Sequence, residues 1–186
     1  MNVFDAIKSR RSVREFTDKA ISRETIEKLL DAAAQAPNHR MTQPWRFYVL
    51  GPKSRKAYGT VLGGRKAKKV EDPAAAQAVR EKVAAAHEKL PAMIAFAMTE
   101  AADAETREED YASLMMAVQN FCISAAAEGL ATHIKTGAVM QDPGARAATQ
   151  IPEGQKIVAI VELGEPAVVP TAKERAHASQ FTTWLD

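Results

Sequence analysis

The sequence predicts one layered domain of the α/β or α+β class. Three observations predict it: stretches with strand character alternate with stretches at helical spacing, no linker divides the chain, and no internal repeat occurs. A chain of 186 residues with 46% hydrophobic and 26% charged residues is typical of a single globular core. We therefore treat residues 1–186 as one domain.

Two helices are predicted in the first 36 residues. Asn2 can cap the first helix, which delivers three arginines within residues 10–14 at or just beyond its end. The second helix begins after Ser22 and stops near Pro37, because the residue before a proline disfavours the helical region. Residues 37–44 then form a loop.

The next part of the chain predicts a strand and two helices. Residues 45–50 are rich in aromatic and β-branched side chains and predict a buried strand. A short helix follows over residues 52–62 and is broken by Gly63 and its glycine neighbour. Asp72, followed by a proline, predicts the start of an alanine-rich helix that ends near Leu90.

A second core strand is predicted over residues 92–99, followed by a long helix over residues 105–128. The middle of this helix is apolar almost all round, so we expect burial on several of its sides. Gly129 is suited to end the helix in the left-handed conformation.

The last third predicts a loop over residues 131–137, a short helix from Asp142 and a third strand over residues 156–163. The tail, residues 166–186, has few apolar side chains before residues 181–184, which have strand character but no evident partner in their own chain. Two alternatives stay open for this tail: it docks on a second subunit, or it packs back on its own.

Several classes of protein are disfavoured. No apolar run is long enough to span a membrane and the N-terminus lacks the apolar core of a signal peptide, so we expect a cytoplasmic protein without a membrane partner. Neither the glycine fingerprint of dinucleotide-binding folds nor a phosphate-binding P-loop is present. The single cysteine, Cys122, excludes an intramolecular disulfide, and its apolar neighbours favour a buried, inert thiol over a catalytic one.

The formal net charge of +2 does not by itself imply nucleic-acid binding, and we expect no nucleic-acid partner. One segment is nonetheless strongly basic and contains no acid. It is interpreted as a solvated face or mobile loop, with a polyanion site as the alternative. Its cations are Lys53, Arg55, Lys56, Arg65, Lys66, Lys68 and Lys69.

Three arginines and a serine within residues 10–14 suit a phosphate group, because guanidinium forks donate two hydrogen bonds at once. Surface ion pairs with Glu15 and Asp18 are the structural alternative. The four histidines are scattered, so we expect no metal site. The acids at 108–110 complement a helix dipole rather than forming an acid/base pair, and no catalytic side chain is nominated.

Residues 10–16 (RRSVREF), 36–39 (APNH) and 43–47 (QPWRF) together resemble the N-terminal signature of FMN-dependent nitroreductases. The order and spacing are similar to those of the smallest members, and the resemblance continues through the long helix to residues 134–137 and 157–164. It implies an α+β three-layer sandwich with a central, mostly antiparallel sheet flanked by helices. It also implies a domain-swapped homodimer, in which the tail contacts the partner subunit.

The resemblance further implies a tightly bound FMN in a cleft that both subunits line. The residues that match the family's FMN phosphate and ring-edge segment are Arg10, Arg11 and Ser12, with Arg14 as a helper. The loop positions that reach the flavin, commonly that of the neighbouring subunit, are Gln35, Asn38, His39 and Gln43. The segment that covers the isoalloxazine is Ile134, Lys135, Thr136 and Gly137, and the C-terminal pair at the phosphate is Lys173 and Arg175. The smallest members often have an aromatic where this chain has Ile134, which affects the shape of the substrate pocket.

The implied activity is NAD(P)H-dependent reduction of nitroaromatic or other small electrophilic acceptors. NADH or NADPH would pass a hydride to flavin N5, leave, and be replaced by the acceptor in a ping-pong cycle. An alternative keeps the flavin for another task, such as enone reduction, dehalogenation or cofactor biosynthesis. A third hypothesis, from a different class, is a polyanion-binding or interaction protein without redox activity.

Overall fold

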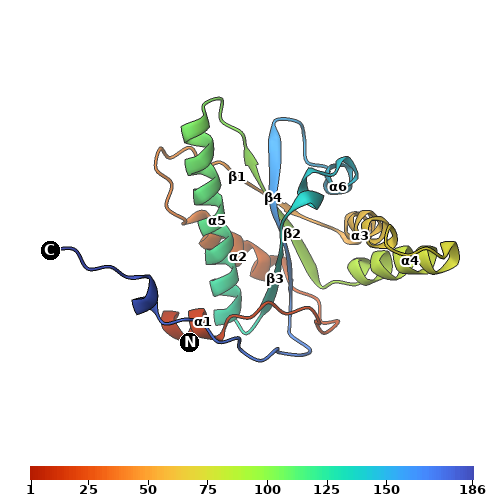
Figure 1. Ribbon diagram of the computed structural model, residues 1–186, viewed down its shortest axis with the longest axis horizontal. Coiled ribbons are helices and arrows are strands. Elements are labelled where there is room, and N and C mark those ends of the chain that lie inside the picture. The colour runs from red at the N-terminus through yellow and green to blue at the C-terminus, as the bar shows by residue number, and fades with distance from the viewer.

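The computed structural model describes residues 1–186 and has three layers (Figure 1). The middle layer is a four-stranded sheet in the order β1-β2-β4-β3, and every neighbouring pair of strands is antiparallel. Its strands are β1 (Trp45–Val49), β2 (Ala92–Thr99), β3 (Ala131–Lys135) and β4 (Gln155–Gly164). The expected α+β sandwich with a mostly antiparallel sheet is confirmed.

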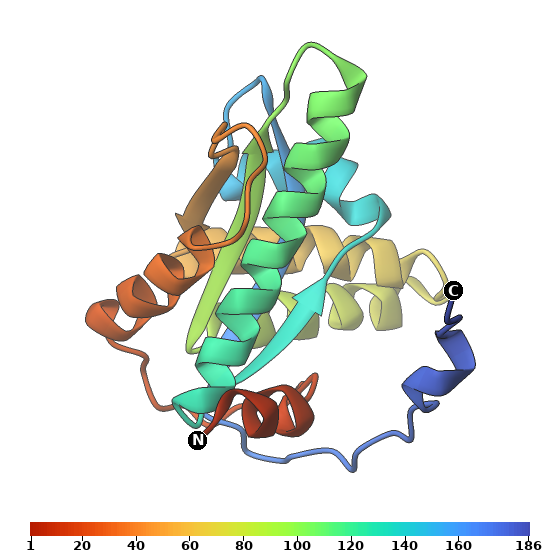
Figure 2. The same ribbon diagram turned by 90° about the vertical axis from the view of Figure 1, so that its left-hand side faces the viewer.

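Helices cover both faces of the sheet (Figures 1 and 2). One face carries α1 (Val3–Ser9), α2 (Arg23–Ala34) and α5 (Ala104–Ala127). The other carries α3 (Pro52–Ala67), α4 (Pro73–Glu88) and α6 (Pro143–Thr149), while two short 3-10 turns, Ala138–Gln141 and Ala178–Phe181, complete the elements. None of these helices has the length and apolar composition that a bilayer crossing requires.

The core is divided by the sheet into two apolar clusters. Successive side chains of a strand point to opposite faces, so Ile94 and Phe96 of β2 face α5 while Ala95 faces α3 and α6. Phe96 lies edge-on between Phe47 and Phe121, with ring centroids 5.2 and 5.4 Å apart. This packing fixes α5 against the sheet.

A β-bulge interrupts the pairing of β2 with β4. The register shifts between Phe96 and Ala97, which leaves Val158 without an opposite residue. Val158 and Ala159 therefore both pack in the cluster that faces α5. Beyond the bulge, Glu162 points to the other face, towards α4.

The predicted helix starts are confirmed. The side chains of Asn2, Ser22, Asp72 and Asp142 each accept a hydrogen bond from a first-turn N–H of the helix that follows. Gly129, with φ of +76°, follows α5 in the left-handed conformation as expected. Cap chemistry therefore determines most helix boundaries in this chain.

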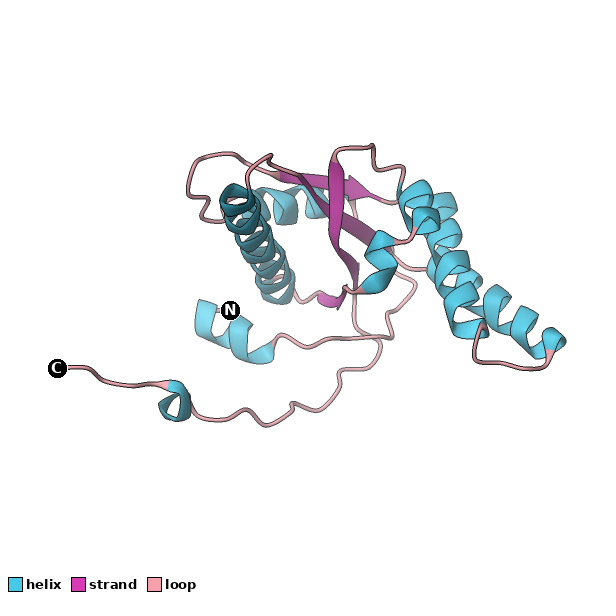
Figure 3. Cartoon of the chain, turned by 45° about the horizontal axis from the view of Figure 1, so that its top comes forward, coloured by secondary structure: helices cyan, strands magenta, loops and turns pink.

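The predicted break of the helix at residues 63–64 is wrong, because α3 continues to Ala67. Gly59 and Gly63 lie on the side of α3 that packs against α4. A Cβ atom on Gly63 would lie 2.8 Å from the Cα of Arg80, and one on Gly59 would lie 2.7 Å from the Cβ of His87. These glycines permit close packing of the two helices, which extend from the body as a hairpin (Figure 3).

Two predictions about strands also need correction. The predicted loop at 131–137 is largely strand β3, because its backbone pairs with β4 along residues 131–135. The strand at 45–49 is present but lies at a sheet edge rather than buried, and Val49 is 52% exposed. Local sequence did not reveal either position in the sheet.

Burial of α5 on several sides is only partly found, since Tyr111 and Met116 remain exposed. The tail does not form the predicted strand and runs away from the body as an extended segment with one short turn (Figure 1). Phe181 is 78% exposed and Trp184 is 91% exposed, so packing of the tail end on its own subunit is wrong. These apolar side chains have no cover within one chain.

Candidate functional site

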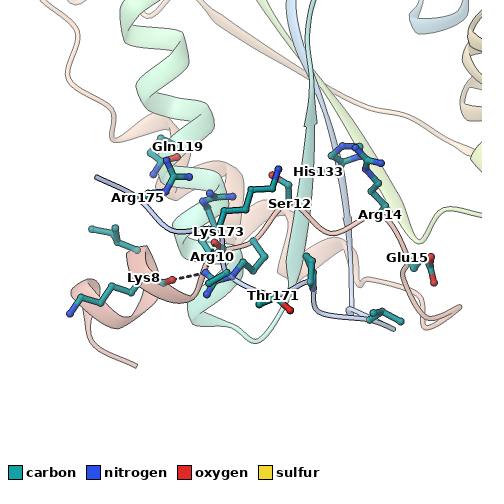
Figure 4. Close-up of a pocket in the computed structure, with 15 residues that line it drawn as sticks. Lys8, Arg10, Ser12, Arg14, Glu15, Gln119, His133, Thr171, Lys173 and Arg175 are labelled. Atoms are coloured by element: carbon teal, nitrogen blue, oxygen red, sulfur yellow. Dashed lines mark hydrogen bonds between the residues drawn. The ribbon is translucent and has the colours of Figure 1, made fainter. Parts of the chain in front are cut away.

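A cleft of about 1210 Å³ lies where α1, the segment after it, α5, β3 and the tail meet (Figure 4). Its lining combines six cationic side chains with the single carboxylate of Glu15. The six cations are Lys8, Arg10, Arg11, Arg14, Lys173 and Arg175. The cleft therefore favours an anionic group.

The arginine segment is held in an extended conformation beside β3. The N–H of Val13 donates to the carbonyl of Thr132 at 3.0 Å, and Ser12 forms a parallel bridge with Thr132. Val13 is buried, so side chains that alternate with it, those of Ser12 and Arg14, lie on the opposite side and line the cleft. Burial of Val13 thus directs the side chains of Ser12 and Arg14 into the cleft.

None of Arg10, Arg11 and Arg14 forms an ion pair, and neither Glu15 nor Asp18 neutralises them. The structure therefore contradicts the alternative in which Glu15 and Asp18 form surface ion pairs with these arginines. Arg11 donates through Nη1 to the carbonyls of Lys8 (2.6 Å) and Arg10 (3.1 Å), while its buried Nε has no partner. The cluster retains its full positive charge.

The predicted loop residues lie at a second place, beside the first half of α5. The Oδ1 of Asn38 accepts the N–H of Gln43 at 2.7 Å, and Thr42 donates to Asp110. His39 Nδ1 lies 2.9 Å from the carboxylate of Glu109. The acids of α5 therefore tether this loop, a role beyond the dipole interaction expected from sequence.

Two residues of the same loop, Met41 and Gln43, have φ of +51° and +44°, a conformation that non-glycine residues rarely adopt. Gln35 caps the end of α2 just before the loop.

The loop lies far from the cationic cleft. Glu109 beside the loop and Gln119 beside the cleft are ten residues apart on α5, which corresponds to about 15 Å along its axis. The loop therefore does not share the cleft with the arginines of its own chain.

The predicted site residues 134–137 lie at a third location, at the end of β3. Ile134 packs against the core that faces α5, and Gly137 adopts φ of +95°. Lys135 pairs with the buried Glu162. Thr136 lines a smaller cavity of about 400 Å³ on the side of α3.

Of the fourteen predicted site residues, the structure brings six together in the cleft: Arg10, Arg11, Ser12, Arg14, Lys173 and Arg175. The other eight lie in the loop or at the end of β3. Sequence reasoning missed Lys8, Gln119, His133 and Thr171, which also line the cleft. Lys8 had a signal, since it lies in the last turn of α1, just before the arginines. Gln119 had none, because only tertiary packing brings α5 there.

The basic segment at 53–69 is mostly helix α3, with Lys68 and Lys69 just beyond its end, rather than a mobile loop. Lys56 pairs with Glu88 at 3.0 Å and Arg65 with Asp142 at 3.4 Å. Arg55 donates to the carbonyls of Leu50 (3.0 Å) and Glu88 (3.2 Å), and burial lowers its pKa. Lys56 and Arg55 therefore join α3 to the end of α4, and Arg55 and Arg65 also join the hairpin to the body.

A buried ionic network lies between β3, β4 and α4. Glu162 contacts Lys135 and accepts from His133 Nδ1 at 3.0 Å, and the Nε2 of His87 lies 3.5 Å from the same carboxylate. Burial opposes ionisation of Glu162, but the His133 hydrogen bond and the Lys135 charge outweigh it and leave its pKa below the usual value. Burial lowers the pKa of His87 and raises that of Tyr58.

Cys122 is buried as expected, and burial raises the pKa of its thiol. No group of three His, Cys, Asp or Glu side chains is arranged to hold a metal ion. The cationic cleft is thus the main concentration of binding chemistry in the chain.

Comparison with known proteins gives a consistent result. The nitroreductase family model matches residues 7–165. YfhC of Bacillus subtilis (strain 168), whose name gives it provisionally as an NAD(P)H nitroreductase, is 27% identical over 171 residues, or 92% of this chain and 88% of the relative. A nitroreductase-like family protein from Bacillus cereus is 30% identical and superposes with a TM-score of 0.84 over 100% of this chain and 97% of its own.

The fold also matches the FMN and NADPH-dependent nitroreductase NfnB from Sphigopyxis sp. strain HMH, with a TM-score of 0.77, 17% identity and full coverage of both chains. At that identity the likeness concerns the fold alone. The family model, in contrast, spans most of the sequence, including the arginine segment that lines the cleft. The chain belongs to the nitroreductase family.

Proposed function

We propose that the protein is an FMN-dependent NAD(P)H oxidoreductase that reduces nitroaromatic or other small electrophilic acceptors in a ping-pong cycle. The observation that carries this proposal is the cleft in which six cations face one carboxylate and the arginines form no ion pairs. The names of similar proteins, an FMN and NADPH-dependent nitroreductase among them, support the same cofactor and donor.

The cleft fits the phosphate of FMN by its donor chemistry. A phosphate monoester carries close to two negative charges at neutral pH and has three acceptor oxygens. Arg10, Arg11 and Ser12 supply guanidinium and hydroxyl donors, and Lys173 and Arg175 of the tail supply further positive charge in the same cleft. The volume of the cleft leaves room for more than the phosphate.

The protein's own residues bind, orient and shield. FMN, when bound, supplies hydride transfer between the nicotinamide donor and the acceptor. Arg14 would lie beyond the phosphate and place positive charge beside the ring edge, and residues 134–137 would cover the ring. We assign no side chain the role of obligatory acid or base.

A homodimer belongs to this proposal. Phe4 of α1, Tyr111 of α5 and Trp184 of the tail are exposed in a single chain, although water contact with such side chains is unfavourable. Self-association would cover them. It would also allow Asn38 and His39, about 15 Å from the cleft along α5, to reach the flavin of the other subunit.

The purified protein tests the proposal directly. It should be yellow and should release FMN on denaturation. Under anaerobic conditions, addition of NADH or NADPH should bleach the flavin colour. Reoxidation rates with nitroaromatics, enones and halogenated compounds would then identify the acceptor class. A protein that cannot take up FMN even as apoprotein would overturn the proposal.

A further inference from the structure

The side chain of His133 is oriented by a buried partner. It lies opposite Glu162 in the pairing of β3 with β4, and its Nδ1 is 3.0 Å from Oε2 of that residue. Because an ionised carboxylate only accepts hydrogen bonds, Nδ1 must carry the proton. When the ring is neutral, its lone pair is therefore on Nε2.

In this network, Nε2 of His133 is the one ring nitrogen without a polar partner. Lys135 donates to Glu162 and lies 3.0 Å from Nε2 of His87, whose Nδ1 in turn donates to the carbonyl of Val83 at 2.7 Å. Nε2 of His133, however, has no hydrogen-bond partner and is not among the buried unpaired atoms. It is therefore accessible, in a residue that lines the cleft.

His133 lies at the sheet end of the cleft. Figure 4 shows it beside Arg14, while Lys8 and Arg175 lie at the opposite end. A phosphate held by Arg10, Lys173 and Arg175, which Figure 4 shows on the Lys8 side of His133, leaves the phosphate-free part of the ligand to extend past Ser12 towards His133. This part of a flavin carries hydroxyl and N–H donors, which a neutral imidazole Nε2 accepts.

We propose that His133 is a ligand-binding residue whose Nε2 accepts a hydrogen bond from the phosphate-free part of the flavin, and that Glu162 is the positioning residue that fixes its tautomer. The inference rests on the proposed function, since it takes the flavin to be the ligand of the cleft. It adds a polar contact to a site otherwise defined by positive charge.

Binding measurements separate this contact from the phosphate contacts. FMN and riboflavin affinities of the apoprotein are measured by flavin fluorescence, riboflavin by competition where its binding is weak. His133→Leu should weaken both ligands about tenfold, in keeping with the loss of one buried hydrogen bond. His133→Gln, which retains an acceptor, should recover most of the affinity, and Arg10→Ala should weaken FMN far more than riboflavin.

Histidine-labelled protein gives a readout that needs no stable variant. In the ¹H–¹⁵N spectrum of the wild-type apoprotein at mildly alkaline pH, His133 should show the Nδ1–H tautomer, and its Nε2 signal should shift when FMN is added. His177→Gln, at an exposed tail position, is the control and should leave FMN affinity unchanged.

The outcomes distinguish the two proposals. A wild-type protein that binds neither flavin would remove the proposed function, and the inference with it. A wild-type protein that binds FMN, with an unchanged affinity in His133→Leu or an unshifted Nε2 signal, would refute the inference alone.

Discussion

The N–H of Val13 donates to the carbonyl of Thr132 at 3.0 Å, joining the segment after α1 to the edge of the sheet. Val13 itself is buried against the core. Through this bond the positions of Ser12 and Arg14 in the cleft depend on a strand more than a hundred residues later in the chain. The site can form only when both ends of the fold have assembled.

Arg10→Ala should weaken FMN binding about ten- to a hundredfold, because it removes a charged donor from a cluster whose arginines form no ion pair. Fluorescence titration of the apoprotein measures this change. Lys66→Ala is the control, since Lys66 lies in the smaller cavity beside α3. Equal losses in the two variants would contradict the assignment of the arginine cluster to the phosphate.

Gly63→Ala should destabilise the protein by about 1–3 kcal/mol, because the added Cβ would meet the backbone of Arg80 at 2.8 Å. Gly64→Ala provides a matched control at the next position of the same helix, where a Cβ meets nothing within 4 Å. That variant should gain about 0.5–1 kcal/mol from helix propensity. Urea unfolding measures both, and equal effects would mean that α3 and α4 pack less closely than described.

Deletion of residues 178–186 should weaken the proposed dimer, because it removes Phe181 and Trp184, which have no cover in one chain. Sedimentation velocity over a range of protein concentrations measures the shift towards monomer. The double substitution Phe181→Ser with Trp184→Ser should act in the same direction while keeping the tail length. An unchanged dimer in both variants would show that the tail end makes no intersubunit contact.

Stability should fall in mild acid because of His87. Burial lowers its pKa in the folded protein, so near pH 6.5 the unfolded chain takes up a proton that the native ring resists. The free energy of unfolding should therefore rise with pH through this range, with a slope of up to about 1.4 kcal/mol per pH unit from this one group.

Urea unfolding at pH 5.5, 6.5 and 7.5 checks this linkage. His87→Gln should flatten the dependence, whereas His177→Gln, at an exposed position, should leave it unchanged. Glu162 acts at lower pH: its lowered pKa contributes stability that is lost as the pH falls through the folded value. A slope that His87→Gln does not alter would assign the linkage to other groups.

The sequence predicted the elements whose signals are local. Caps such as Asn2 and Ser22 gave helix starts, and the apolar run at 92–99 gave the central strand. The helix through Gly63 was missed because glycine there serves a contact with α4, which no local rule contains. Strand β3 was missed because its sequence has no clear alternation of apolar and polar side chains.

The residues of the candidate site likewise divide into those with a local sequence signal and those without one. The arginines at 10–14 were recognisable because they are close in sequence, and the tail pair Lys173 and Arg175 entered only through the family resemblance. Gln119 could not be recognised, because the packing of α5 against the sheet, not its neighbours in sequence, brings it to the cleft.

The bulge at Val158 decides on which side of the sheet a negative charge is buried. If Val158 took a regular paired position and residues 157–162 alternated strictly, Glu162 would enter the apolar layer under α5, where neither Lys135 nor His87 could compensate it. Straightening the bulge with all its residues retained would thus turn the far end of the strand over and leave an uncompensated carboxylate in apolar surroundings, whereas deletion of Val158 would remove the bulge and keep Glu162 on its present face. The irregular pairing at the bulge is therefore needed to keep the carboxylate of Glu162 beside its positive partner.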